Sequence, residues 1–193
     1  MNDRVLTRLF LLLLCLTQIR VAVAQGTPDP WYGRSSRPRD FEAPKTPLGN
    51  FAIELPKNWQ IVPGYAQIIL TAAEKTRSDQ IGAAIVLEHV QLRSPLAVTP
   101  AVAEVELTTI REREPGGQDF SQQIKEGNGR PFIFIQYTRP GHAGPDRVVQ
   151  YSILAGSVMY RLICVVSAAQ LAKYQSTFAH VAASFKVTTP GSN

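Results

Sequence analysis

The sequence predicts an α+β domain: a mostly antiparallel sheet of about six to seven strands covered by helices, in the order β-β-β-α-β-β-β-β-α. Three observations support this fold class. Short runs of apolar and polar residues alternate with a period of two, tight-turn residues separate most of these runs, and the period changes to that of a helix in two places. Short links between successive strands favour antiparallel pairing, with the helices packed on the faces of the sheet.

The first half of the domain contains three predicted strands and one helix. The segment Phe51–Leu55 alternates apolar and polar residues and ends at Pro56, which is typical of a half-buried strand. Residues 67–72 and 81–92 also have strand composition. Thr99 precedes a proline, a pattern typical of a helix N-terminus, so we expect a charged helix over residues 101–114 that ends at residues 115–117.

The second half contains four predicted strands, over residues 119–126, 131–138, 147–155 and 158–166. A Gly-Asn-Gly turn at residues 127–129 separates the first two. Gly156-Ser157 is a two-residue hairpin turn, which makes the last two strands antiparallel neighbours. Residues 139–146 contain two prolines and two glycines, so we expect the longest loop of this half there.

The last predicted element is an amphipathic helix. Ser167 and Gln170 have the spacing of a capping box, in which each side chain accepts a hydrogen bond from a free backbone N–H of the first turn. Apolar residues then recur on one helical face: Leu171, Tyr174, Phe178, Val181, Ala182 and Phe185. We expect this face to lie on the sheet.

The N-terminus has the three parts of a secretory signal peptide. Arg4 and Arg8 precede a short apolar run, and a small-x-small site follows at Ala22–Ala24. We therefore predict a signal peptide over residues 1–24, cleaved after Ala24, and a secreted or periplasmic mature protein. The alternative is an uncleaved membrane anchor, which Gln18 and Arg20 make unfavourable by interrupting the apolar run.

A Pro-rich segment follows the signal peptide. We predict a flexible spacer over residues 25–47, the folded domain over residues 48–188 and a flexible tail over residues 189–193, because the spacer has too few apolar residues to form a core. Trp31 and Tyr32 are the exception in the spacer. Either this aromatic pair docks on a partner or on the domain itself, or it has no specific contact.

Charge and cysteine content exclude several function classes. Removing residues 1–24 lowers the net charge from +5 to +3, and no Lys/Arg run remains, so we do not expect nucleic-acid binding. Cys15 leaves with the signal peptide, and the remaining Cys164 cannot form an internal disulfide. Its apolar strand context predicts a buried small side chain in preference to a nucleophile.

The order of elements resembles the PsbP/Mog-type fold, an antiparallel sheet sandwiched by helices. The opening Phe51-Ala-Ile-Glu-Leu-Pro-Lys-Asn-Trp59 is similar to the start typical of that family, as is the closing helix with Ser184-Phe185 at its end. The resemblance covers residues 48–187 and suggests an exported bacterial member. It implies a module that binds a partner or assists assembly and has no catalytic activity; fold alone does not determine function.

The sequence contains no recognisable catalytic constellation or cofactor motif. His89, His142 and His180 are not spaced as zinc ligands, and neither a nucleophile elbow nor a phosphate-binding loop is present. We expect His180 as a solvated residue on the flank or exposed side of the last helix, and His89 within a strand. The acidic residues of the first helix alternate with arginines, which is typical of a solvated helix surface: Glu104, Glu106, Glu112 and Glu114.

We therefore expect a non-catalytic exported binding or assembly module of the cell envelope, with no cofactor, no metal, and another envelope protein as its partner. The candidate surface consists of five residues from the spacer and the 139–147 loop: Trp31, Tyr32, Arg139, His142 and Asp146. The alternative is a periplasmic small-ligand or metal carrier. It would use either that loop, where His142 and Asp146 could share a ligand, or an apolar sheet face carrying strand aromatics.

Overall fold

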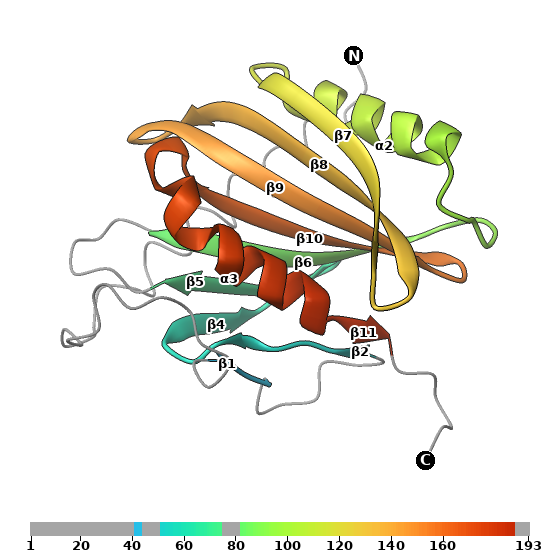
Figure 1. Cartoon of the computed structure of the whole chain (residues 1–193), viewed down its shortest axis with the longest axis horizontal. Coiled ribbons are helices and arrows are strands. Elements are labelled where there is room, and N and C mark those ends of the chain that lie inside the picture. The colour runs from blue at the N-terminus through green and yellow to red at the C-terminus, as the bar shows by residue number, and fades with distance from the viewer. Residues whose placement is uncertain (1–40, 44–50, 75–81, 188–193) are drawn as a thin grey trace.

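A seven-stranded antiparallel sheet forms the body of the protein (Figure 1). The computed structural model describes residues 41–43, 51–74 and 82–187. The strand order is β4-β5-β6-β10-β9-β8-β7, and all neighbours pair antiparallel, which confirms the predicted fold class. The strands are β4 (Trp59–Pro63), β5 (Ile68–Glu74), β6 (Ala83–Gln91), β7 (Gln118–Gly127), β8 (Arg130–Gly141), β9 (Gly144–Ala155) and β10 (Val158–Ser167).

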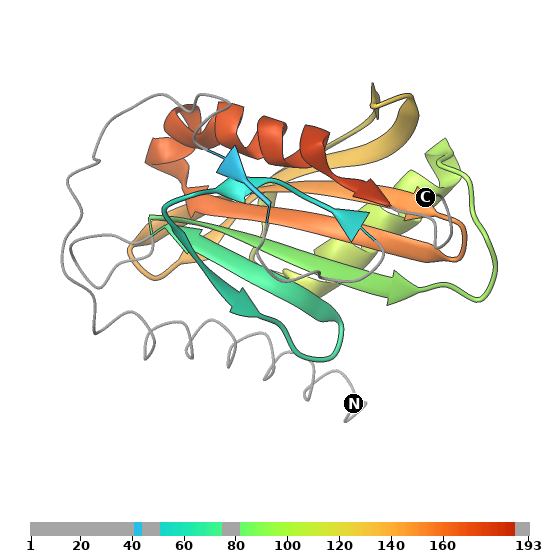
Figure 2. The same ribbon diagram turned by 90° about the horizontal axis from the view of Figure 1, so that it is seen from below.

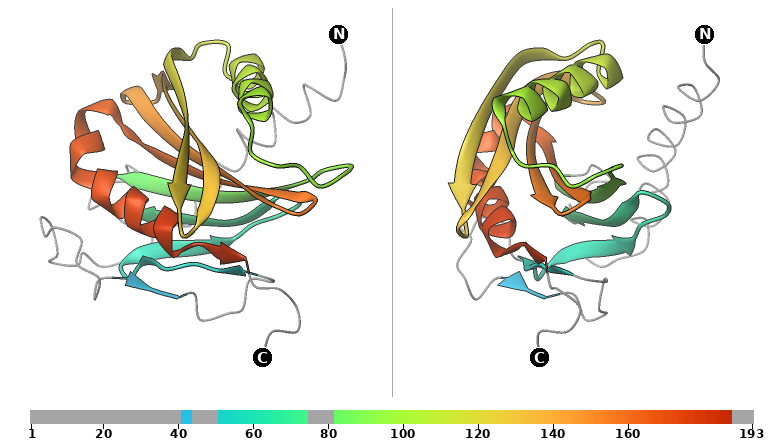
Figure 3. Two further views of the ribbon diagram at one scale, coloured as in Figure 1. Left: turned by 45° about the vertical axis from the view of Figure 1, so that its right-hand side comes forward. Right: turned by 90° about the vertical axis from the view of Figure 1, so that its right-hand side faces the viewer.

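Two α-helices among the described residues pack on opposite faces of this sheet (Figures 1 and 2). α3 (Leu171–Ser184) covers one face, where Tyr174, Phe178 and Val181 join the larger apolar cluster. α2 (Pro100–Arg113) lies on the other face against β8 and β9 and forms a smaller cluster around Ala103 and Leu107. The sheet is thus sandwiched by helices, and it curls strongly from β7 to β4 (Figure 3).

Two short strand pairs lie beside the main sheet. β2 (Phe51–Ala52) pairs with β11 (Lys186–Val187), and β3 (Leu55–Pro56) pairs with β1 (Phe41–Glu42). The strand expected over Phe51–Leu55 is therefore two separate two-residue strands, and β4, which the sequence analysis did not predict, begins the main sheet instead. Phe41 falls within the expected spacer, yet its side chain is buried in the α3-side cluster.

The two helices begin differently from one another. In α2 the N-cap is Thr99, whose Oγ1 accepts a hydrogen bond from the N–H of Val102 at 3.3 Å, and the proline follows directly, as predicted. Before α3 the chain forms a 3-10 turn, η2 (Ala168–Gln170), and Ser167 makes no side-chain capping bond. The predicted capping box is wrong because the tight 3-10 turn takes the place of the first α-helical turn.

The segment 139–146 is a continuous hairpin and not the expected long loop. β8 and β9 remain paired until Gly141 faces Gly144, so that only His142 and Ala143 form the turn. Pro140 lies opposite Pro145, a position in an antiparallel ladder where neither residue needs to donate a backbone hydrogen bond. A Cβ at Gly141 would lie 2.5 Å from the Gly144 carbonyl oxygen, so this turn requires glycine. The two prolines and two glycines therefore shape a hairpin end here.

The contact between α3 and the sheet generates a stability prediction. Phe178 is 1% exposed at the centre of the α3-side cluster, whereas Gln175 on the same helix is exposed. We expect Phe178→Ala to lower the free energy of unfolding by about 3–5 kcal/mol, because it removes a buried ring and leaves a cavity. Urea unfolding measures this loss. Gln175→Ala is the matched control, and equal losses in the two variants would contradict the packing described here.

Candidate functional site

A buried polar cluster lies between α2 and the sheet. On α2 the buried side chains are Ala103, Glu106, Leu107 and Ile110, spaced as one helical stripe. Glu106 is the one charged residue of that stripe and is only 3% exposed. A carboxylate buried in this way requires donors from the sheet beneath it, because transferring an ion out of water is costly.

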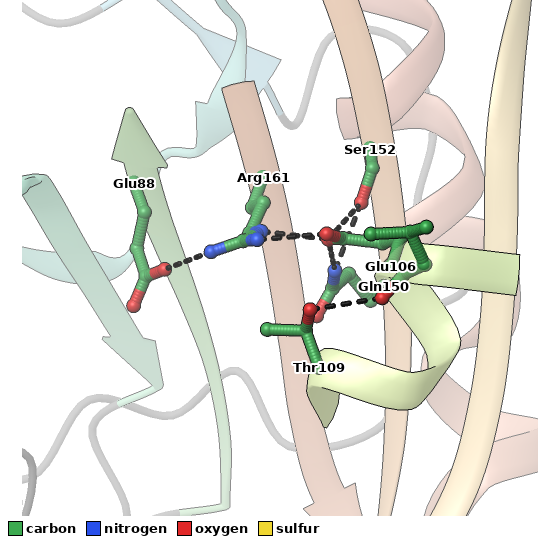
Figure 4. Close-up of polar contacts among 7 residues, drawn as sticks. Glu88, Glu106, Thr109, Gln150, Ser152 and Arg161 are labelled. Carbon is green, nitrogen blue, oxygen red and sulfur yellow. Dashed lines mark hydrogen bonds and ion pairs between the residues drawn. The ribbon is translucent and has the colours of Figure 1, made fainter. Parts of the chain in front are cut away.

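The sheet supplies those donors from two neighbouring strands. On β10, Arg161 donates from Nε to Glu106 Oε1 at 2.6 Å and from Nη2 to Oε2 at 2.7 Å, a bidentate ion pair (Figure 4). On β9, Gln150 Nε2 and Ser152 Oγ donate to Oε1 at 2.8 and 3.0 Å. Both oxygens of Glu106 are therefore occupied, and the charge is held by short, charge-assisted hydrogen bonds.

A second carboxylate faces the other side of Arg161. Glu88 on β6 is directly opposite Arg161 in the strand register, and its Oε2 lies 3.9 Å from Arg161 Nη1 (Figure 4). Burial raises the pKa of Glu88, while the positive charges of Arg161 and Arg113 oppose that shift. The guanidinium thus separates two carboxylates, one tightly bound and one only loosely paired.

This arrangement is suited to holding α2 on the sheet. Glu106 is buried and accepts four hydrogen bonds, all from side chains of β9 and β10, so we assign it a structural role. The expectation that the acidic residues of the helix are all solvated is wrong for Glu106. It holds for Glu104 and Glu112, which are exposed. The available signal was the position of Glu106 within the apolar stripe, combined with a lone arginine in an otherwise apolar strand.

The predicted surface on residues 139–147 is partly assembled by the hairpin. Arg139 Nη1 donates to Glu114 Oε1 at 2.8 Å, and Arg139 Nε lies 4.0 Å from Asp146 Oδ2, so Arg139 joins the end of α2 to the hairpin. Partial burial raises the pKa of Asp146, against the opposing charge of Arg139. His142 is exposed at the turn. Arg139 and Asp146 thus lie close together, whereas His142 lies at the tip beyond them, and a binding role of these residues stays a prediction.

The other predicted candidates differ in their surroundings. Trp31 and Tyr32, like the predicted signal peptide, lie outside the described residues. Cys164 is fully buried, and burial raises the pKa of its thiol, in line with the expected inert side chain. Within the described ranges, no group of three or more His, Cys, Asp or Glu side chains is placed to hold a metal ion.

His180 is not simply a solvated residue of α3. Its Nε2 lies 2.9 Å from Glu54 Oε2, and the Phe41 ring packs on the imidazole with centroids 3.9 Å apart. The expectation failed because it considered the helix alone. The segments β1 and β3 lie on that flank of α3 and bring Phe41 and Glu54 to it. His180 therefore helps to hold β1 and the residues before β3 against α3.

Comparison with solved structures confirms the predicted PsbP/Mog-type fold. Cyanobacterial PsbP from Synechocystis superimposes with a TM-score of 0.59 at 11% identity, covering 84% of this chain and 98% of that one. LpqN of Mycobacterium tuberculosis, described as involved in cell envelope biogenesis, gives a TM-score of 0.53 at 12% identity over 72% and 83% of the two chains. The Ran-binding protein Mog1p of Saccharomyces cerevisiae gives a TM-score of 0.53 at 7% identity, covering 76% of this chain and 95% of that one.

Sequence comparison adds nothing to this likeness. No protein-family model matches the chain, and no curated protein matches it in sequence. At 7–12% identity the likeness shows the fold alone. The described helices are too short or too polar to cross a membrane.

The role of Glu106 predicts a large difference between two glutamates of one helix. We expect Glu106→Gln to lower the free energy of unfolding by about 3–5 kcal/mol, because it removes the close counter-ion of the buried Arg161 and leaves only the loosely paired Glu88. Glu104→Gln removes the same charge from an exposed position and should change stability by less than about 0.5 kcal/mol. Urea unfolding at neutral pH compares them. Similar losses would show that the buried pair does not hold α2.

Glu88 predicts a pH dependence of stability. Its pKa in the folded protein is raised above 4.5, so the folded state binds more protons than the unfolded state in the window above that value. The contribution of Glu88 therefore makes the free energy of unfolding fall as the pH rises through the folded-state pKa. Glu88→Gln should remove this part of the slope in urea titrations at a series of pH values. An unchanged slope would mean that Glu88 ionises as easily in the folded as in the unfolded chain.

Proposed function

We propose that this chain is a non-catalytic exported binding or assembly module of the cell envelope. The observation that carries the proposal is that the charged side chains buried between α2 and the sheet bind one another and are used to hold the fold together. The solved structures that share the fold include a Ran-binding protein and a protein involved in cell envelope biogenesis. The first description favours partner binding, and the second favours a role in the cell envelope.

The end of the β8–β9 hairpin is the surface best suited to a partner. It extends through twelve-residue strands to an exposed turn at His142. Arg139, which lies close to this turn, anchors the end of the hairpin by contacting Glu114 at the end of α2. A partner that binds a rigid hairpin loses less conformational entropy than one that must order a flexible loop. We therefore place the protein-binding surface at this tip, and Trp31 and Tyr32 in the spacer remain a second candidate contact.

Site-specific photocrosslinking tests this surface. A photoreactive residue at position 142 in the exported full chain should give one reproducible protein adduct in cells. The same residue at position 175, exposed on α3, should not give that adduct. Arg139→Ala should weaken the adduct at position 142, because the hairpin loses its contact with α2. Identical adduct patterns at the two positions would contradict a specific surface at the tip.

Export itself is a separate prediction. The sequence of residues 1–24 leads us to expect a mature protein that begins at Gln25 and is released in the envelope fraction. Intact-mass and N-terminal peptide measurements on protein isolated from its own cells check this. Ala24→Leu should slow cleavage, because signal peptidase requires a small residue there, whereas Asn2→Leu is a control outside the cleavage site. A cellular protein that retains Met1 would contradict the envelope assignment.

A further inference from the structure

The main sheet ends in two edge strands that differ in length. β4 is five residues long and ends in Pro63, which has no backbone N–H to donate to a further strand. β7, at the other edge, is ten residues long, and no strand among the described residues pairs with its outer side. It forms the outer margin of the curled sheet (Figure 3). β7 is therefore the edge to which another strand can be added.

The part of β7 that can pair regularly is Ser121–Gly127. Before it, the register between β7 and β8 shifts between Gln118 and Ser121, and Asp119 has a φ of 53°. A bulge of this kind bends the strand and interrupts the ladder, so regular pairing with a further strand begins after it. From Ser121 onwards the ladder with β8 is continuous, and this stretch contains no proline. The midpoint of the regular stretch is Ile124.

Ile124 gives this polar edge an apolar centre. It lies opposite Ile133 of β8, hence on the α2 side of the sheet, and its side chain is 39% exposed. Among the exposed large apolar side chains of the described residues, it is the one that lies in a strand. A lysine often protects an edge strand from pairing, but the Nζ of Lys125 lies 3.8 Å from the centre of the Phe134 ring on the neighbouring β8. This charge is therefore held over its own sheet.

A second copy of β7 complements the regular stretch when a two-fold axis passes through Ile124. In antiparallel pairing about this axis, Ile124 lies opposite its own copy, and each residue of the regular stretch has a partner. Gln122 then faces Glu126. Gln123 faces Lys125, so that like charges are not directly opposite each other. An axis through Lys125 would place two lysines opposite each other, and an axis through Gln123 would place Ile124 against Gln122. The sequence of β7 thus favours the axis at Ile124.

We propose that two copies of this chain associate through β7 in this register and join their main sheets into one continuous antiparallel sheet. Seven residues of edge strand bury less surface than the about 1,200–2,000 Å² of a stable complex, so the dimer is reversible and dissociates in the micromolar range or above. The hairpin tip lies beyond the start of β7, because Gln118 pairs with Thr138. Antiparallel pairing therefore places the two tips at opposite ends of the dimer, and the dimer does not depend on what the tips bind.

Analytical ultracentrifugation of the full mature chain, from micromolar to millimolar concentration, tests the proposal. We expect a reversible equilibrium between monomer and dimer. Ile124→Lys should weaken the dimer by about tenfold or more, because two lysines would then face each other at the axis. Val105→Lys is the matched control, since Val105 is 67% exposed on α2 and lies away from the edge. A chain that stays monomeric at millimolar concentration, or equal weakening by the two variants, would overturn the proposal.

Disulfide crosslinking locates the axis. Directly opposite residues have Cβ atoms about 4.5–5.5 Å apart, so Ile124→Cys should give a covalent dimer under mild oxidation. Glu126→Cys should not, because in this register the two copies of residue 126 are offset by four residues, about 13 Å along the strands. The native Cys164 is buried and does not compete. Equal crosslinking of the two variants, or none by Ile124→Cys, would overturn this register. The equilibrium measured on the unmodified chain does not depend on the folding of any variant.

Discussion

The bidentate pair between Glu106 and Arg161 is the interaction on which the α2 side of this structure depends. Apolar contacts alone give α2 a small cluster, with Ala103, Leu107 and Ile110 on the helix. The pair adds a directional contact that fixes the position of the helix along β10 and β9. Buried ion pairs contribute little net stability compared with apolar residues of the same size, but they are costly to break. The pair therefore determines the position of α2 on the sheet, and it adds little to the net free energy with which the helix packs there.

The same pair explains how a polar site can exist on an apolar sheet. The guanidinium of Arg161 is planar, and once two of its nitrogens bind Glu106, the third is directed towards Glu88. The helix thus orients Arg161, whose remaining nitrogen Nη1 is buried, makes no hydrogen bond and lies 3.9 Å from Glu88 Oε2. On the opposite face α3 packs mainly through aromatic and aliphatic side chains, such as Phe178 and Val181, and the hydroxyl of Tyr174 donates a hydrogen bond to Glu74 on β5.

The sequence predicted the elements whose pattern is local. The stripe of α3, the Thr99-Pro100 start of α2 and the turn at Gly156-Ser157 each depend on a few neighbouring residues, and all three are present. The errors arose where the outcome depends on a distant partner. β4 owes its place to pairing with β5, and the extension of the β8–β9 hairpin depends on Pro140 meeting Pro145 across the ladder.

The candidate site was less predictable than the fold for the same physical reason. Glu106 and Arg161 are 55 residues apart, and each resembles an ordinary member of its own element, a charged helix and an apolar strand. Only the conflict within each element indicated the contact, because a charge on a buried stripe requires a counter-charge from elsewhere. Arg139 and Asp146 were placed on one candidate surface because they lie within eight residues of sequence, whereas the hairpin that sets them opposite each other was not predicted.

The Arg161 side chain offers the most direct measurement of this account. In a nitrogen-15 NMR spectrum of the full mature chain, the Nε–H of Arg161, assigned by its loss in Arg161→Lys, should exchange slowly with water and remain visible at neutral pH, because it is buried and bound to Glu106. Its resonance should shift or disappear in Glu106→Gln. An Arg161 Nε–H that exchanges as fast as that of the exposed Arg111 would show that α2 is not held on the sheet by this pair.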